Sequence, residues 1–153
     1  MELDSNQISK LLSSDKSLNF LGVFALDEIP ETIDTRKPIC LIFNSDDSTR
    51  EGEHWIPIIF SNGTCIYLDS LGISPFQPVT SIIQKHSDRC VFNKNLIQNP
   101  NAGLCGFYAV YFCKKTTVDV PKLERILKPF SPHRLHQNDK FVMEWVTKYA
   151  KTL

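Results

Sequence analysis

Several features that mark specialised proteins are missing from this sequence. Its 153 residues contain 17 Lys and Arg against 17 Asp and Glu, so the chain lacks the positive excess of a dedicated nucleic-acid-binding protein. No apolar run reaches the roughly 20 residues that a membrane-spanning helix needs. The opening residues include Glu2 and no hydrophobic run, and we therefore expect no secretory signal.

Paired cysteine motifs are missing as well. The five cysteines lie far apart without a CxxC pair, and the four histidines do not alternate with them at zinc-finger spacings. We expect neither a metal site nor stabilising disulfides, but reduced thiols inside a cell. The chain also lacks internal repeats and low-complexity stretches, which predicts a single domain over residues 1–153.

The pattern of apolar residues predicts an α+β domain. Asp4 and Gln7 are spaced as a capping box before a short helix over Ser5–Ser13. The apolar run Leu104–Lys115 alternates small residues with aromatic ones, which is typical of a helix buried on most sides. Further helices are predicted over Pro78–His86, from Asp119-Val120-Pro121 onward, and after Asn138 and Asp139 as N-caps of an amphipathic C-terminal helix.

The clearest local signal is a β-hairpin. The segments His54–Phe60 and Thr64–Asp69 flank Asn62-Gly63, the preferred pair of a type I′ turn. Pro57 in the first segment indicates an edge strand or a bulge. Shorter strands are predicted over Ile39–Phe43 and Arg89–Phe92.

The hairpin and the buried helix together predict a reactive centre. A two-residue turn places His54 and Asp69 at the same open end, where the carboxylate can orient the imidazole. Cys105 falls at the predicted start of a helix, where the helix dipole and a protonated histidine stabilise a thiolate. Taken singly, each residue has an ordinary structural explanation, as a strand-end histidine, a turn-forming aspartate and a packed thiol.

Residues around Cys105 fit nucleophilic catalysis. Gly103 and Gly106 leave room for a substrate carbonyl, and backbone N–H groups at a helix start can stabilise an oxyanion. Gln98, seven positions before Cys105, can add a side-chain amide donor, although by itself it reads as a loop residue.

These residues resemble the adenovirus-type cysteine proteases, or adenains, and the wider group that includes SUMO-specific proteases. The resemblance rests on the order His54, Asp69, Gln98 and Cys105, with Trp55 after the histidine and Gly106 after the cysteine. Similar segments are residues 20–22, 40–44, 49–55, 67–72, 88–90 and 98–106, and more weakly 131–132 and the last helix.

The resemblance implies a papain-like fold of the adenain and SUMO-protease type, with a mixed sheet flanked by helices. It also implies roles for single residues: Cys105 as nucleophile, His54 as general base, Asp69 as its orienter and Gln98 as oxyanion-hole donor. Trp55 would line the site, while a plain core tryptophan is an equal alternative. No cofactor or metal is needed for this chemistry.

The departures from the family pattern bear on the substrate. Leu104 stands where SUMO proteases have Asp directly before the nucleophile. This departure favours a viral maturation protease that cleaves capsid and other structural precursors. Such an enzyme would act in the virion or in the host cell interior, that is, the cytoplasm or the nucleus. Asp69 instead follows the deconjugating enzymes, since adenoviral enzymes usually have Glu there. The short C-terminal end suggests the virophage and Polinton/Maverick branch. A SUMO or ubiquitin-like deconjugase, and a non-catalytic host-interaction module, remain the alternatives.

The resemblance further implies an activator. Adenoviral relatives are stimulated by DNA and by a capsid-derived peptide that adds a strand and forms a disulfide. Asp88-Arg89-Cys90 matches the segment holding that cysteine, so Cys90 is the predicted partner, with an ordinary strand cysteine as the alternative. The balanced charge predicts weak DNA stimulation or none, and we expect no membrane partner.

Overall fold

The structure of the protein is a computed structural model that describes residues 2–46, 49, 54–117 and 122–153. The segment Asp119-Val120-Pro121, predicted to begin a helix, and residues 50–53 of the family resemblance lie outside these ranges. No helix in the described ranges combines the length and apolar character needed to cross a membrane.

A five-stranded mixed sheet forms the centre of the fold, in the order β1-β2-β3-β4-β5. β2 and β3 pair antiparallel, as do β3 and β4, whereas β1 pairs with β2 and β4 with β5 in parallel. The strands are β1 (Phe20–Phe24), β2 (Ile39–Asn44), β3 (Trp55–Ser61), β4 (Thr64–Tyr67) and β5 (Arg89–Phe92). The α+β class and the mixed sheet flanked by helices are confirmed.

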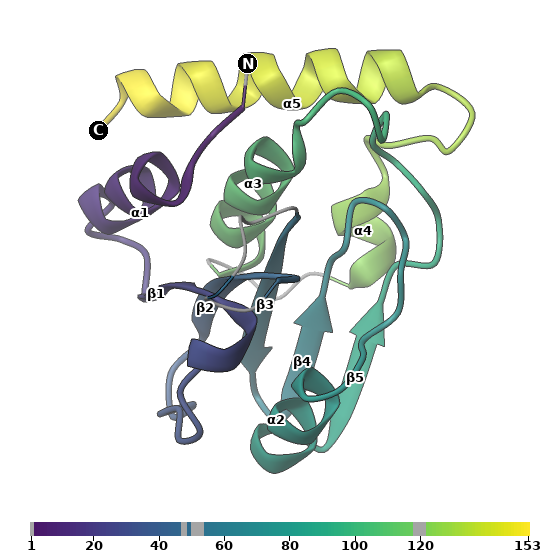
Figure 1. Ribbon diagram of the computed structural model, residues 1–153. Helices are drawn as coiled ribbons and strands as arrows, with labels where there is room; N and C mark the ends of the chain where they lie inside the picture. Colours follow the sequence, from purple (N-terminus) through teal and green to yellow (C-terminus); the bar gives the residue numbers. More distant parts are fainter. Residues whose placement is uncertain (1, 47–48, 50–53, 118–121) are drawn as a thin grey trace.

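Helices cover both faces of the sheet (Figure 1). They are α1 (Ser5–Ser14), α2 (Val79–His86), α3 (Cys105–Thr117), α4 (Leu123–Leu127) and α5 (Leu135–Lys151), with a 3-10 turn at Leu26–Glu28. α1, α3 and α5 pack with one face of the sheet around a large apolar core, while α2 covers a second core on the other face. β2 is buried along its whole length because both of its faces are covered.

Several local predictions are confirmed. The capping box of Asp4 and Gln7 starts α1, and α3 is buried on nearly all sides. Asn62 and Gly63 have φ values of 50° and 77°, as a type I′ turn requires. β3 and β4 therefore pair in the predicted hairpin, with Ile58 opposite Tyr67.

The prediction of an edge strand from Pro57 is wrong, because β3 lies between β2 and β4. Pro57 pairs with Ile42 of β2, and its carbonyl accepts a hydrogen bond from Leu68 N–H at 3.3 Å. Its nitrogen faces the same side as that carbonyl, beyond the last paired residues of β3 and β4. The N–H that proline lacks would face Leu68, so Pro57 ends the ladder between β3 and β4 without lying on an edge of the sheet.

The prediction that Asn138 and Asp139 cap the last helix is also wrong. α5 begins at Leu135, one turn earlier, and both side chains are buried inside the fold. Asn and Asp cap a helix by bonding to N–H groups of its first turn. Asn138 bonds instead to the backbone of Ser131 and Ile97, and Asp139 bonds to Asn99 and Tyr108. Both residues support the candidate site instead.

Candidate active site

The open end of the hairpin brings His54 and Asp69 together. His54 directly precedes β3, and Asp69 lies two residues beyond β4, so both stand just outside the strands predicted to contain them. Nε2 of His54 lies 2.5 Å from Oδ1 of Asp69, and the two residues are 8% and 1% exposed. The carboxylate thereby fixes the ring orientation and leaves Nδ1 as the nitrogen available to another group.

That other group is the thiol of Cys105, at the first residue of α3. Burial of the imidazole lowers the pKa of His54, but hydrogen bonds to Asp69 and to Cys105 outweigh it and raise this pKa to about 9. The imidazolium is therefore the stable form at neutral pH, beside a thiol at the positive end of a helix. The structure thus places a cationic imidazole against the thiol at the start of α3.

Asp69 is held in place by its own loop and by β5. Its Oδ1 also accepts from Leu71 N–H at 2.8 Å, and its carbonyl accepts from Gly72 N–H at 2.8 Å. The amide of Asn93, just after β5, donates to the same carbonyl at 2.6 Å. Gly72 has φ +75°, and a Cβ there would lie 2.7 Å from the backbone carbon of Asn95, so only glycine lets these two loops meet.

Gln98 is hydrogen-bonded to Ser70, the neighbour of Asp69, and this contact sets the orientation of its side-chain amide. The hydroxyl of Ser70 donates a hydrogen bond to Oε1 of Gln98, and Gln98 N–H donates to the Ser70 carbonyl at 3.2 Å. Because its oxygen is already engaged, the side chain presents its NH₂ group as the free donor. An amide donor with a fixed orientation is what the predicted oxyanion-hole role of Gln98 requires.

Helix α5 supports the Gln98 loop from behind. Asn138 donates its amide to the carbonyl of Ile97 at 2.9 Å, and Asp139 accepts from Tyr108 Oη at 2.8 Å and from Asn99 N–H at 3.4 Å. Burial and Asp139 raise the pKa of Tyr108, which keeps its hydroxyl protonated as a donor. The residues on both sides of Gln98 are thus tied to buried side chains.

Sequence reasoning missed these supporting residues. Ser70 and Asn93 carry no local motif, and Asn138 with Asp139 reads locally as a helix cap. One signal was present, because buried polar side chains at apolar positions of an amphipathic helix must find partners inside the fold. Asn138 lies on the same face as Val142 and Val146, all of them buried.

The remaining predicted residues are placed as follows. Trp55 begins β3, is partly buried and packs against the larger core beside His54. Cys90 lies in β5, opposite Cys65 of β4. Space beside Gly103 and Gly106 is not open as expected, because Glu2 and Leu3 of the N-terminal segment occupy it. In the described ranges, no three His, Cys, Asp or Glu side chains are grouped to hold a metal ion.

Comparisons with known proteins show the family and the fold of the chain. A family model described as adenovirus endoprotease matches residues 20–152. A search of curated proteins finds no match. Among solved structures, the ASFV pS273R protease is similar with a TM-score of 0.60 and 16% identity, covering 92% of this chain and 66% of that one. A selenomethionine structure of the same protease is covered over 43% of its length.

SUMO proteases share the fold too. The C-terminal protease domain of Ulp1, in complex with the yeast SUMO ortholog Smt3, has a TM-score of 0.56 and 18% identity, covering 97% of this chain and 78% of that one. Because the identities are 16% and 18%, these two solved structures show only that the chain shares their fold. Its family is shown by the match to the family model. That match extends over most of the chain, from β1 to the end of α5. The chain therefore belongs to the adenovirus endoprotease family of cysteine proteases.

Proposed function

We propose that this chain is a cysteine endopeptidase that cleaves viral capsid and other structural precursor proteins during virion maturation, through Cys105, His54 and Asp69. The observation that carries the proposal is one imidazole placed between a buried carboxylate, at 2.5 Å, and a thiol at a helix start. Family membership supports a protease.

The reaction follows from the protonation states at neutral pH. The Cys105 thiolate attacks the scissile carbonyl, and the negative charge moves to the carbonyl oxygen. The donors to that oxygen are the amide of Gln98 and the N–H of Cys105, which belongs to the first turn of α3, where N–H groups have no acceptor within the helix. The His54 imidazolium then protonates the leaving amine, and the neutral imidazole activates a water molecule that hydrolyses the thioester.

Structural precursors are the preferred substrate class for two reasons. The family model that matches is the adenovirus endoprotease, and Leu104 replaces the Asp that precedes the nucleophile in SUMO proteases. We expect small residues, chiefly Gly, beside the cleaved bond, and action in the virion or in the host cell interior. The assignment to a virophage or Polinton/Maverick element stays a prediction.

Removal of a ubiquitin-like modifier is the second candidate. Two observations favour it: Asp69 as the acid beside His54, and the similarity to Ulp1 over 97% of this chain. Both candidates use the same residues, so they differ only in the substrate that docks.

The test is cleavage by the purified chain of three substrates: a Gly-rich peptide from a structural precursor, a fluorogenic SUMO conjugate and a fluorogenic ubiquitin conjugate. We expect cleavage of the peptide, and a Cys105→Ala variant should lose it by at least about 10³-fold. Cys113→Ala, on the same helix but distant from His54, is the matched control. Cleavage by Cys105→Ala at the wild-type rate contradicts the mechanism, and preference for a conjugate selects the second candidate.

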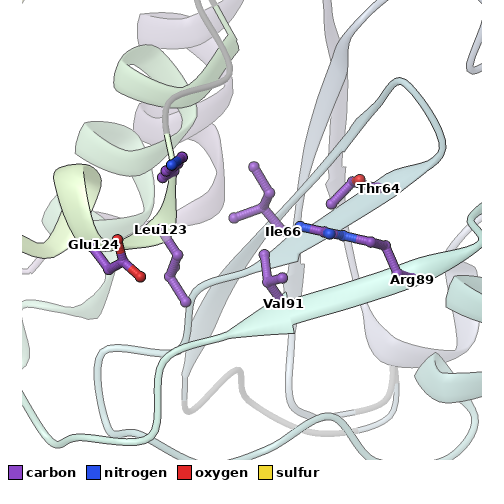
Figure 2. Close-up of a pocket in the computed structure, with 7 residues that line it drawn as sticks. Thr64, Ile66, Arg89, Val91, Leu123 and Glu124 are labelled. Carbon is purple, nitrogen blue, oxygen red and sulfur yellow. The ribbon is translucent and has the colours of Figure 1, made fainter.

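An activating peptide is the proposed partner of β5. This strand is the outer strand of the described sheet, so its free edge can accept another strand. Beside it lies a cavity of about 520 Å³, in which Ile66, Val91 and Leu123 face one another between Arg89 and Glu124 (Figure 2). Cleavage rates with and without a precursor-derived peptide test this, and adding duplex DNA at low salt tests the expected weak DNA stimulation.

A further inference from the structure

Four cysteines outside the triad form two close pairs. Cys65 and Cys90 are direct partners in the parallel ladder of β4 and β5, and their thiols are hydrogen-bonded. Cys40 of β2 and Cys113 of α3 form a second hydrogen-bonded pair in the larger core. The pairs are chemically alike, so a difference in their reactivity depends on their surroundings.

The geometry of the first pair suits a disulfide. Partners in register on neighbouring strands have Cα atoms about 4.8 Å apart, inside the range of about 4.4–6.8 Å that disulfides span. Their side chains leave the same face of the sheet, toward the smaller core under α2, which contains Cys65 and packs against Cys90. A bond between the two sulfurs therefore needs little movement of the backbone.

The two pairs differ in how far solvent can reach their cysteines. Cys40 and Cys113 are both 0% exposed. Cys65 is also fully buried, but Cys90 is half-buried and lines a cavity of about 380 Å³ between β5 and α2. A small oxidant can therefore reach Cys90 from this cavity, whereas the thiols of Cys65, Cys40 and Cys113 are shielded from solvent.

The roles within the pair are unequal. The hydrogen bond from Cys65 lowers the pKa of Cys90, and the same bond, together with burial, raises the pKa of Cys65. Cys90 is thus the more acidic and more exposed thiol, as a primary oxidation site requires, and Cys65 is the resolving thiol.

We propose that Cys65 and Cys90 form a reversible redox site, in which a hydroperoxide oxidises Cys90 and Cys65 closes a disulfide between β4 and β5. The Cys90 thiolate attacks one peroxide oxygen, the O–O bond breaks, and the departing hydroxide takes a proton to form water. Cys65 then attacks the sulfenic sulfur, its proton leaves with the expelled hydroxide, and a second water forms. Two thiols are oxidised and one peroxide is reduced.

The bond would fix the strands that precede the catalytic loops. β4 ends two residues before Asp69, and β5 ends directly before Asn93, which holds the Asp69 carbonyl. Oxidised protein should therefore melt at a higher temperature than reduced protein. An external thiol, such as one on an activating peptide, would compete with Cys65 for oxidised Cys90. The proposal itself depends on neither protease activity nor such a peptide.

The experiment uses a full-length Cys105→Ala chain, because a reactive nucleophile would itself consume oxidant. The protein is treated with one equivalent of hydrogen peroxide, free thiols are alkylated, and a non-reducing digest is analysed by mass spectrometry. We expect Cys65 and Cys90 to escape alkylation and to appear together in one disulfide-linked peptide pair. Treatment with dithiothreitol before alkylation should restore both free thiols. Cys40 and Cys113 should remain alkylated after denaturation.

Two variants sharpen the result. In Cys65→Ser, Cys90 should accumulate as a sulfenic acid that dimedone traps, whereas Cys40→Ser should leave the linked peptide unchanged. The proposal is overturned if no cysteine is oxidised, if Cys90 is oxidised while Cys65 stays free in the unsubstituted pair, or if Cys40 and Cys113 link equally fast.

Discussion

Each end of helix α3 carries a cluster of ionisable side chains around a buried aspartate. At its start, Cys105 meets His54 and Asp69; near its end, Lys114 meets Asp15, with Lys114 Nζ 2.7 Å from Asp15 Oδ2. The helix dipole favours a cation at its C-terminal end, where Lys114 lies, and stabilises negative charge at its N-terminal end, where Cys105 lies. The two clusters differ in what remains free to react.

The cluster at the end of α3 is saturated. Asp15 accepts from Tyr149 Oη at 2.6 Å and from the N–H and hydroxyl of Ser17, in addition to Lys114. Although burial disfavours the charged carboxylate, these bonds hold the pKa of Asp15 well below its usual range. The cluster joins α1, α3 and α5, and no proton acceptor in it is left for chemistry. At the start of α3, by contrast, the second nitrogen of His54 serves a thiol.

The largest effect should come from the carboxylate at the start of the helix. We expect Asp69→Ala to lower kcat by about 10³-fold, because the imidazole loses its orientation and its charge partner. Asp69→Asn should lose less, since the amide oxygen can still accept from Nε2. The high-pH limb of the pH–rate profile of Asp69→Asn should shift to lower pH, because the carboxylate helps to raise the pKa of His54 in the wild type. An unchanged pH–rate profile in Asp69→Asn contradicts the assignment.

The next effect concerns Gln98 and the residue that orients it. Gln98→Ala should lower kcat by about 10²-fold with little change in KM, as expected for an oxyanion-hole donor. Ser70→Ala should reproduce part of that loss, because Oε1 is released and the amide can rotate. Ser70→Thr, which keeps the hydroxyl, is the matched control. A loss of kcat in Ser70→Ala that comes with a large fall in melting temperature would indicate a merely structural role for Ser70.

A smaller effect, on stability alone, should come from the other end of α3. Asp15→Asn should lower the free energy of unfolding by about 2 kcal/mol, because charge-assisted bonds to Lys114 and Tyr149 are weakened. Urea unfolding measures this, with cleavage by the folded variant expected to stay at the wild-type rate. Asp34→Asn, at an exposed ion pair with Arg36, should cause no measurable change.

The same cluster predicts how stability depends on pH. The folded-state pKa of Asp15 lies below that of the unfolded chain, so its contribution is complete above the unfolded value of about 3.9 and is lost as pH falls further. Melting temperatures of wild type and Asp15→Asn should therefore converge in acid. A constant difference down to about pH 2 would show that the charge of Asp15 is not responsible.

Much of this arrangement could be predicted from the sequence, because its signals are local. Asn62-Gly63 fixes a hairpin, and a two-residue turn leaves only one way to bring His54 beside Asp69. The start of α3 could be placed from the change to a long apolar run. These local signals predicted which residues meet.

The supporting contacts could not be predicted, because their partners are far apart in the chain. Asn138 bonds to the carbonyl of Ile97, 41 residues earlier, and Tyr149 to Asp15, 134 residues earlier. The local sequence predicts a helix cap at Asn138 and an edge strand at Pro57. It does not contain the information that β3 has a neighbouring strand on each side. The pairing of Cys65 with Cys90 likewise depends on the register of two parallel strands.

The central claim is that the start of α3 activates Cys105 through His54, and the most direct test is the alkylation rate of Cys105 by iodoacetamide between about pH 5 and pH 10. With the pKa of His54 raised to about 9, wild-type Cys105 should react at neutral pH, well below the ordinary thiol pKa of about 8.5. His54→Ala should return the titration to about that ordinary value. A wild-type profile that rises only near the ordinary thiol pKa and is unchanged by His54→Ala would contradict the account.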